Sequence, residues 1–373
     1  MEILEINTKD RRQLEQFIQL PFFIYKDDPN WAPPLYMDIK KVFDRDKYVF
    51  YQHSDASFFL AVNDTGEALG RIAVLENTRY NALHEEKVAF FFLFECVNDY
   101  AVANALIERA AQWAKVRGLV KIVGPKGFTP LSGMGMLVEG YDFPPAMEQA
   151  YNPEYYAQFL ESLGFSRIRE LLTGRLYPTE TIPEKIHYLS ERVQKRFGLR
   201  VDRFTNRRQL RKVVPYLKDL YNQTLTGSGG NPAITDADVK VMAAQMIWFA
   251  DPHLIKILMK EDKPIGLLLA YQNIAPAIRK AKGRLLPFGW VHILKALRNP
   301  RTIDINGSGV IPEYRGLGGT AVLFSEMEKS LLEGKFEYAE MIQIGTDNEK
   351  ILRELDSLGI HFNKKHAIYE KEI

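Results

Sequence analysis

The chain has 373 residues, more than one hydrophobic core of ordinary size organises, so we expect two domains. Its 46% hydrophobic and 26% charged residues are typical of globular proteins, and a net charge of +2 gives no reason to expect bulk binding to nucleic acid or membranes. A single cysteine, Cys96, excludes an internal disulfide framework and indicates a reducing compartment. Because Cys96 follows an apolar run, we expect a buried, inert thiol.

The first residues lack the basic and apolar regions of a signal peptide. No apolar run reaches the ~18 residues needed to span a bilayer. We therefore expect a cytoplasmic protein.

The first half predicts alternating strands and helices. Residues 57–62 and 68–75 are predicted to form a β-hairpin. Both segments are rich in strand-forming residues, and the short loop between them contains Gly66. Residues 100–117 have apolar side chains at three- and four-residue spacing, which predicts a helix packed on a sheet. The remaining expected elements are strands at 88–96 and 120–124, a loop at 125–150, a helix at 153–163 and a closing strand at 165–176.

The second half repeats this order. A proline-containing segment around residues 178–183 is the best domain boundary, so the predicted domains are 1–177 and 178–373. Near the end of each half a helix stops at a Leu-Gly pair, Leu163-Gly164 in the first and Leu358-Gly359 in the second. The repetition predicts a tandem α/β protein.

Residues 302–321 read as a strand, a glycine-rich loop and the start of a helix. Glycines allow sharp turns, and the first N–H groups of a helix attract anions. Arg315 adds a permanent cation that can fork onto a phosphate. The sequence therefore predicts an anion site; the alternative is a glycine-rich connection that binds no ligand.

The run from Val310 to Thr320 resembles the GCN5-related N-acetyltransferase (GNAT) superfamily, whose phosphate loop is Arg or Gln, two residues, Gly, one residue, then Gly or Ala. Thr320 departs from this pattern at the last position. The resemblance implies an α/β (α+β) fold of two tandem acyl-CoA N-acyltransferase-like domains, each a mixed central sheet flanked by helices. It also implies that acetyl-CoA or another acyl-CoA is bound by the C-terminal domain, at Val310, Ile311, Arg315, Gly316, Leu317, Gly318, Gly319, Thr320 and Asn348.

At the matching place in the first half stand residues 95–100, which contain acids but no glycine. Charge repulsion and bulk there argue against a diphosphate. The N-terminal copy is therefore interpreted as degenerate.

Asp304 resembles the acidic base of the family's histone-acetylating branch, and Asn306 and Ser308 are expected on the same face of its strand. The alternative for Asp304 is a solvated carboxylate at the start of a strand. The family's usual general-acid tyrosine is replaced by Leu355, and by Leu160 in the first half. The acceptor is expected near Gly229 and Tyr271.

The function that the resemblance implies is acyl transfer, with acetyl as the expected group, to a small-molecule or peptide amine. Two alternatives stay open: a non-catalytic acyl-CoA sensor or scaffold, and an aminoacyl-tRNA-dependent transferase, supported only by basic residues between 192 and 212. No metal-ligand spacing appears among the histidines.

Residues 263–303 contain no acid, and basic residues lie on both sides of the apolar segment 285–294. This insert could cover the site of an acidic or long-chain acyl substrate, or touch a membrane surface. The alternative is a helical insert packed on the domain or in a homodimer.

Overall fold

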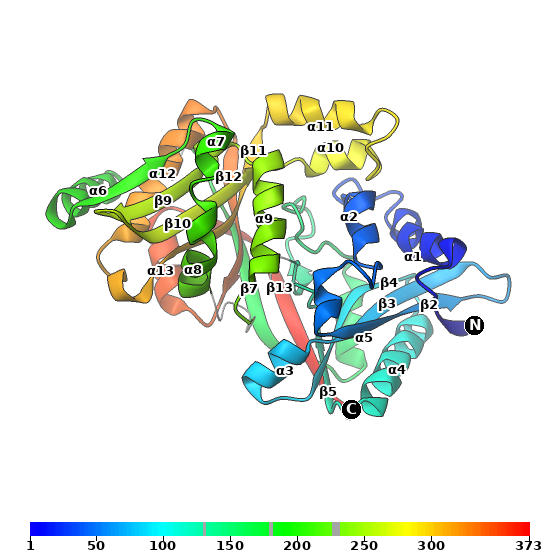
Figure 1. Cartoon of the computed structure of the whole chain (residues 1–373). Helices are drawn as coiled ribbons and strands as arrows, with labels where there is room; N and C mark the ends of the chain where they lie inside the picture. Colours follow the sequence, from blue (N-terminus) through cyan, green and yellow to red (C-terminus); the bar gives the residue numbers. More distant parts are fainter. Residues whose placement is uncertain (130–131, 179–181, 226–231) are drawn as a thin grey trace. The chain divides into compact units, whose positions relative to one another are not determined.

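The computed structural model describes residues 1–129, 132–178, 182–225 and 232–373 (Figure 1), apart from the side chains of residues 244–249. The described residues form two compact units. Unit 1 comprises Met1–Leu171, Ala275–His292 and Lys364–Ile373, and unit 2 comprises Leu172–Ile274 and Ile293–Asn363. The partition of the chain into domains 1–177 and 178–373 stays a prediction.

Unit 1 is built on strands in the order β1-β2-β3-β4-β5-β13, with β6 paired to β13. Its elements are β1 (Glu2–Glu5), α1 (Arg11–Ile24), α2 (Tyr36–Lys41), β2 (Asp55–Val62), β3 (Ala68–Glu76), α3 (Thr78–His84), β4 (Val88–Cys96), α4 (Tyr100–Val116), β5 (Lys121–Gly124), β6 (Met136–Glu139), α5 (Tyr155–Ser162), α10 (Ala275–Lys280) and most of β13 (His361–Glu372). The chain passes between the units within β7 (Ser166–Leu176), α11 (Gly289–Arg298) and β13.

Unit 2 has strands in the order β12-β11-β10-β9-β8. Its elements are α6 (Glu184–Phe197), β8 (Leu199–Arg203), α7 (Arg207–Leu210), α8 (Val214–Leu225), α9 (Asp236–Phe249), β9 (Ile255–Lys260), β10 (Lys263–Gln272), β11 (Thr302–Val310), α12 (Gly319–Glu333), β12 (Tyr338–Gly345) and α13 (Glu349–Ser357). Helix α12 packs along α6 in this unit.

Unit 1 has a hydrophobic cluster on each face of its sheet. One cluster is formed with α4 and α5, and the other with α1 and α2. The predicted helix at residues 100–117 is confirmed as α4, and its periodic residues Val102, Leu106, Ala110 and Trp113 are all buried. The amphipathic pattern therefore identified the packed face of this helix correctly.

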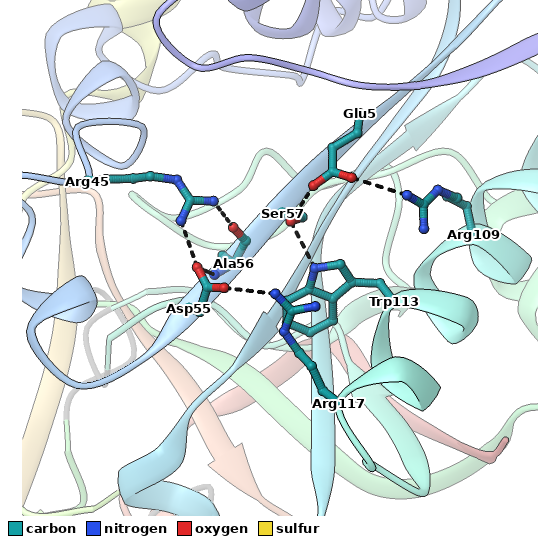
Figure 2. A network of polar contacts seen from close by, with 8 residues as sticks. All are labelled: Glu5, Arg45, Asp55, Ala56, Ser57, Arg109, Trp113 and Arg117. Atoms are coloured by element: carbon teal, nitrogen blue, oxygen red, sulfur yellow. Dashed lines mark hydrogen bonds and ion pairs between the residues drawn. The ribbon is translucent and has the colours of Figure 1, made fainter.

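Polar contacts fasten α4 to the first two strands of unit 1 (Figure 2). The indole N–H of Trp113 donates to Ser57 Oγ at 2.8 Å, and that hydroxyl donates to Glu5 Oε1 at 2.7 Å. Arg117 donates to Asp55 Oδ2 at 3.0 Å and lies over the Trp113 ring at 3.7 Å. Exposed ion pairs contribute at most about 1 kcal/mol each. Among these polar contacts, the buried Trp113–Ser57 hydrogen bond therefore does most to fix the helix in position.

Both units contain a bulged strand that parts from its parallel neighbour. In unit 1, β4 pairs with β5 at Val88–Phe90 but continues to Cys96, and its register with β3 shifts around Leu93. In unit 2, β11 pairs with β12 at Thr302–Ile305 but continues to Val310, with Asn306 as the extra residue opposite β10. A bulge bends its strand and disrupts the ladder locally. Each unit thus has two parallel strands that are paired at one end only.

Candidate functional site

The glycine-rich loop of unit 2 joins β11 to α12. After β11, residues Pro312–Tyr314 form a short 3₁₀ turn, and α12 begins at Gly319. Gly316 and Gly318 have φ angles of +83° and +85°. An L side chain is strained at such angles, so both turns require glycine.

The glycines of this loop differ in what surrounds them. A Cβ on Gly318 would lie 2.9 Å from Val193 of α6, and one on Gly319 would lie 2.8 Å from Leu258 of β9. A Cβ at either position would require a neighbouring side chain to shift, so packing favours glycine at both positions even without a ligand. A Cβ on Gly316 would meet nothing within 4 Å. The backbone at Gly316 thus borders open space.

The N-terminus of α12 has the features of an anion site. Gly318 occupies the N-cap position and has no side chain with which to satisfy the first N–H groups of the helix. Arg315 is exposed beside this end, and its Nε donates to the carbonyl oxygen of Val310 at 3.0 Å. That bond uses one donor of the guanidinium and orients the remaining N–H groups.

Further cations flank the loop. Lys260 and Lys263 lie 5.1 and 5.2 Å from the centroid of the Tyr314 ring, and Lys263 pairs with Glu313 at 3.0 Å. On α6, a shallow hollow of about 400 Å³ is lined by Tyr188, Glu191, Arg192, Lys195 and Arg196. These residues include part of the basic segment noted in the sequence.

The corresponding helix start in unit 1 is closed. Asp99 is the N-cap residue of α4, and its carboxylate accepts the N–H of Ala101 at 2.8 Å. The hydroxyl of Tyr156 accepts the N–H of Cys96 at 2.8 Å, and the Tyr155 hydroxyl donates to the Cys96 carbonyl at 2.8 Å. Side chains of unit 1 thus satisfy the backbone hydrogen-bonding groups at the end of β4.

A buried polar network lies beside this closed end. Glu95 accepts hydrogen bonds from Tyr25 at 2.6 Å and Tyr156 at 2.9 Å, and Arg71 lies 3.8 Å from it. Burial raises the pKa of Glu95, and Arg71 and the two hydroxyls oppose that rise. Burial likewise raises the pKa of the Cys96 thiol, which has the buried position expected from the sequence. The hydrogen bonds and the ion pair of Glu95 thus join α1, β3 and α5 to the end of β4.

Asp304 is fully buried in unit 2, so the alternative expectation of a solvated carboxylate is wrong. The side-chain amide of Asn273 donates to Asp304 Oδ1 at 3.1 Å. Glu340 on β12 and Tyr271 on β10 are its register partners on the neighbouring strands. The bulge at Asn306 interrupts the alternation of β11, so Asp304 is buried while Asn306 is exposed.

The sequence patterns did not identify Glu340, the acid beside Asp304 on β12. Glu340 is 1% exposed, and Arg175 Nε donates to its Oε1 at 2.9 Å. Arg175 also lies 4.0 Å from the centroid of the Tyr338 ring. Burial raises the pKa of Tyr338 to about 12, with Glu340 and Asp304 adding to the rise. An acid within a mostly apolar strand was the available signal in the sequence, and it does not identify Arg175 as the partner.

The other predicted site residues lie at several places. Val310 and Ile311 are buried, Leu317 and Thr320 are partly exposed at the start of α12, and Asn348 caps α13 by accepting the Ile351 N–H at 3.2 Å. Gly229 lies outside the described residues. Leu355 and Leu160 are both buried, which leaves no proton donor at the usual tyrosine position.

Across the described ranges there is no group of three or more His, Cys, Asp or Glu side chains that could hold a metal ion. A search of the same ranges finds no helix with both the length and the apolar character required to cross a membrane.

The strand order, the parting central strands and the glycine loop define a fold class: the chain has the GNAT fold in its tandem form. A tandem GNAT protein from the clavulanic acid biosynthesis pathway, solved without acetyl-CoA, matches with a TM-score of 0.58 at 11% identity, over 100% of this chain and 98% of that one. The fold implied by the resemblance and the mixed α/β class are therefore confirmed.

In sequence, the chain is similar to two curated proteins over nearly its whole length. It is 28% identical over 381 residues to a bacterial ceramide synthase of Caulobacter vibrioides, covering 99% of this chain and 97% of that protein. It is 25% identical over 375 residues to Protein YghO of Escherichia coli, covering 98% of this chain and 94% of that protein. No protein-family model matches the chain.

Proposed function

We propose that this chain is an acyl-CoA-dependent N-acyltransferase whose unit 2 holds the acyl-CoA. The observation that carries the proposal is the contrast between two equivalent helix starts. In unit 2, α12 begins at Gly318 without a capping side chain, next to Arg315 and the open side of Gly316. In unit 1, Asp99 caps the equivalent position. Only the first arrangement suits a diphosphate.

The residues of the loop fit this ligand by their chemistry. The N–H groups from Gly316 to Thr320 would receive the pyrophosphate, and Arg315 would add a charge-assisted contact. The end of β11 beyond the bulge would offer its backbone to the pantetheine arm, because β12 no longer pairs with it there. Bound acyl-CoA supplies an activated acyl group that an amine can accept. The protein contributes orientation and proximity.

Asp304 is our candidate for the group that takes the proton of the amine. It is buried on β11, one residue before the last pair between β11 and β12, Ile305 with Met341, and the Asn273 amide donates to its Oδ1. Asp304→Asn preserves the size of the side chain and removes the base, so it should lower kcat far more than it weakens acyl-CoA binding.

For the acceptor we propose a long-chain amine, and for the donor a long-chain acyl-CoA in place of the expected acetyl-CoA. The support is the similarity to a protein named bacterial ceramide synthase, which extends over 99% of this chain. A ceramide is the amide of a long-chain amino alcohol and a fatty acid. The two reactants would therefore be a long-chain amino alcohol and a fatty acyl-CoA.

The test is thiol release by the purified full chain, measured with acetyl-CoA and with palmitoyl-CoA, each with and without a long-chain amino alcohol. We expect release that depends on the amine and is faster with palmitoyl-CoA, with the amide identified by mass spectrometry. Asp304→Asn should abolish most of it, whereas Asp356→Asn, an exposed acid on α13, should not. Faster release with acetyl-CoA would reject the long-chain proposal. Binding of both donors without release for any amine would reject the transferase in favour of a sensor.

A further inference from the structure

The insert between β10 and β11 exposes large apolar side chains at its tip. The tip comprises residues 285–291, between α10 and the first turn of α11, which are drawn in yellow in Figure 1. Leu286 is 79% exposed, Phe288 74% and Trp290 47%. Adjacent side chains exposed to this degree cost free energy in water, so the arrangement indicates a surface that something apolar covers.

The base of the insert is fixed to unit 1. The N–H of Tyr36 donates to the carbonyl oxygen of Gly283 at 2.8 Å. Arg284 donates to Glu15 Oε1 at 2.6 Å and lies 4.5 Å from the centroid of the Tyr36 ring. These contacts attach the base of the insert to α1 and α2, next to the exposed tip.

The tip also has a defined internal structure. The backbone N–H of Trp290 donates to the carbonyl oxygen of Leu285 at 2.8 Å, and its indole N–H donates to that of Pro287 at 3.0 Å. The indole thus has a satisfied polar edge and an exposed apolar face. Tryptophan in this state is typical of the boundary between water and lipid.

The charged residues of the segment that contains the tip all have one sign. Residues 264–303 contain no Asp or Glu. The basic residues of this segment are Arg279, Lys280, Lys282, Arg284, Lys295, Arg298 and Arg301. Lys280 and Lys282 are exposed at the end of α10 and just after it. An apolar tip surrounded by cations complements an anionic lipid surface, where headgroup phosphates lie above an apolar interior.

We propose that the tip at residues 285–291 docks the protein on the surface of a membrane that contains anionic lipids. Leu286, Phe288 and Trp290 enter the boundary between headgroups and acyl chains, and Lys280 and Lys282 contact phosphates. The inference goes beyond the proposed function, since it requires no acyl-CoA and no acceptor.

The experiment is flotation of the full chain with vesicles of equimolar phosphatidylcholine and phosphatidylglycerol, compared with phosphatidylcholine alone. We expect binding to the anionic vesicles that falls as salt is raised. Lys280→Gln with Lys282→Gln should lower the partition coefficient about five-fold for each cation removed. Leu286→Ser with Phe288→Ser should lower it at least about ten-fold. The matched control is Lys115→Gln with Val116→Ser, an exposed cation and apolar residue on α4.

Circular dichroism and thermal unfolding establish that each variant is folded, which is expected because the substituted side chains are exposed. Trp290 provides a second readout: its fluorescence should shift to the blue on anionic vesicles, and Trp290→Phe should remove that shift. Equal binding to both vesicle types, or unchanged binding of the two tip variants, overturns the proposal. So does a dimer in light scattering that Leu286→Ser with Phe288→Ser converts to a monomer, because the occupant would then be a second copy.

Discussion

Replacing Arg315 by glutamine tests the anion site most directly. The side chain is exposed, and its Nε already donates to the Val310 carbonyl, so the terminal N–H groups are the ones that would reach a phosphate. A hydrogen bond to a charged group contributes about 1.5–3 kcal/mol. Arg315→Gln should therefore weaken the binding of coenzyme A about ten- to 150-fold, at about 1.4 kcal/mol for each factor of ten.

The assay is titration calorimetry with coenzyme A at low and high salt. Because the Debye length falls from about 10 Å at 0.1 M to about 3 Å at 1 M, the difference between the wild type and Arg315→Gln should shrink at high salt. The control is Arg208→Gln, which removes an exposed arginine of α7 in the same unit. Equal affinities of the wild type and Arg315→Gln, or an equal loss in the control, would refute the assignment of the pyrophosphate to this loop.

Two further predictions concern stability. Arg175→Met leaves Glu340 buried without its ion-pair partner and should lower the free energy of unfolding by about 3–5 kcal/mol in urea titrations. Adding Glu340→Gln should restore part of that loss, and no recovery would show that the charge is not the cause. Burial lowers the pKa of His366 to about 4, while its Nε2 contacts the Ala150 carbonyl at 2.9 Å. Since the unfolded chain takes up this proton near pH 6.5, stability should be complete above that pH and should fall by up to about 3 kcal/mol toward pH 4. His366→Gln should flatten this fall in thermal unfolding, and His292→Gln, an exposed histidine, should not.

Local patterns in the sequence predicted the elements that depend on local interactions. The hairpin expected at 57–62 and 68–75 corresponds to β2 and β3, because its loop has the side-chain and glycine chemistry of a tight turn. The strand, glycine loop and helix of residues 302–321 were predicted for the same reason, since positive φ angles require glycine.

The cluster around Asp304 could not be predicted in this way. Arg175 and Glu340 are 165 positions apart, so only the fold brings them together. The face on which Asp304 lies was inferred from simple alternation, which the bulge at Asn306 interrupts. A bulge depends on how two strands pair, and one strand's sequence does not specify it.

The last strand has a consequence for how the protein is made. Residues 1–171 leave the ribosome first, yet Tyr369–Glu372 of β13 pair with β5 of the same unit. Until residues 369–372 have been synthesised, β5 lacks this neighbour, and an unpaired strand edge invites aggregation. A truncation before β13 would therefore damage a unit most of which had been synthesised long before it.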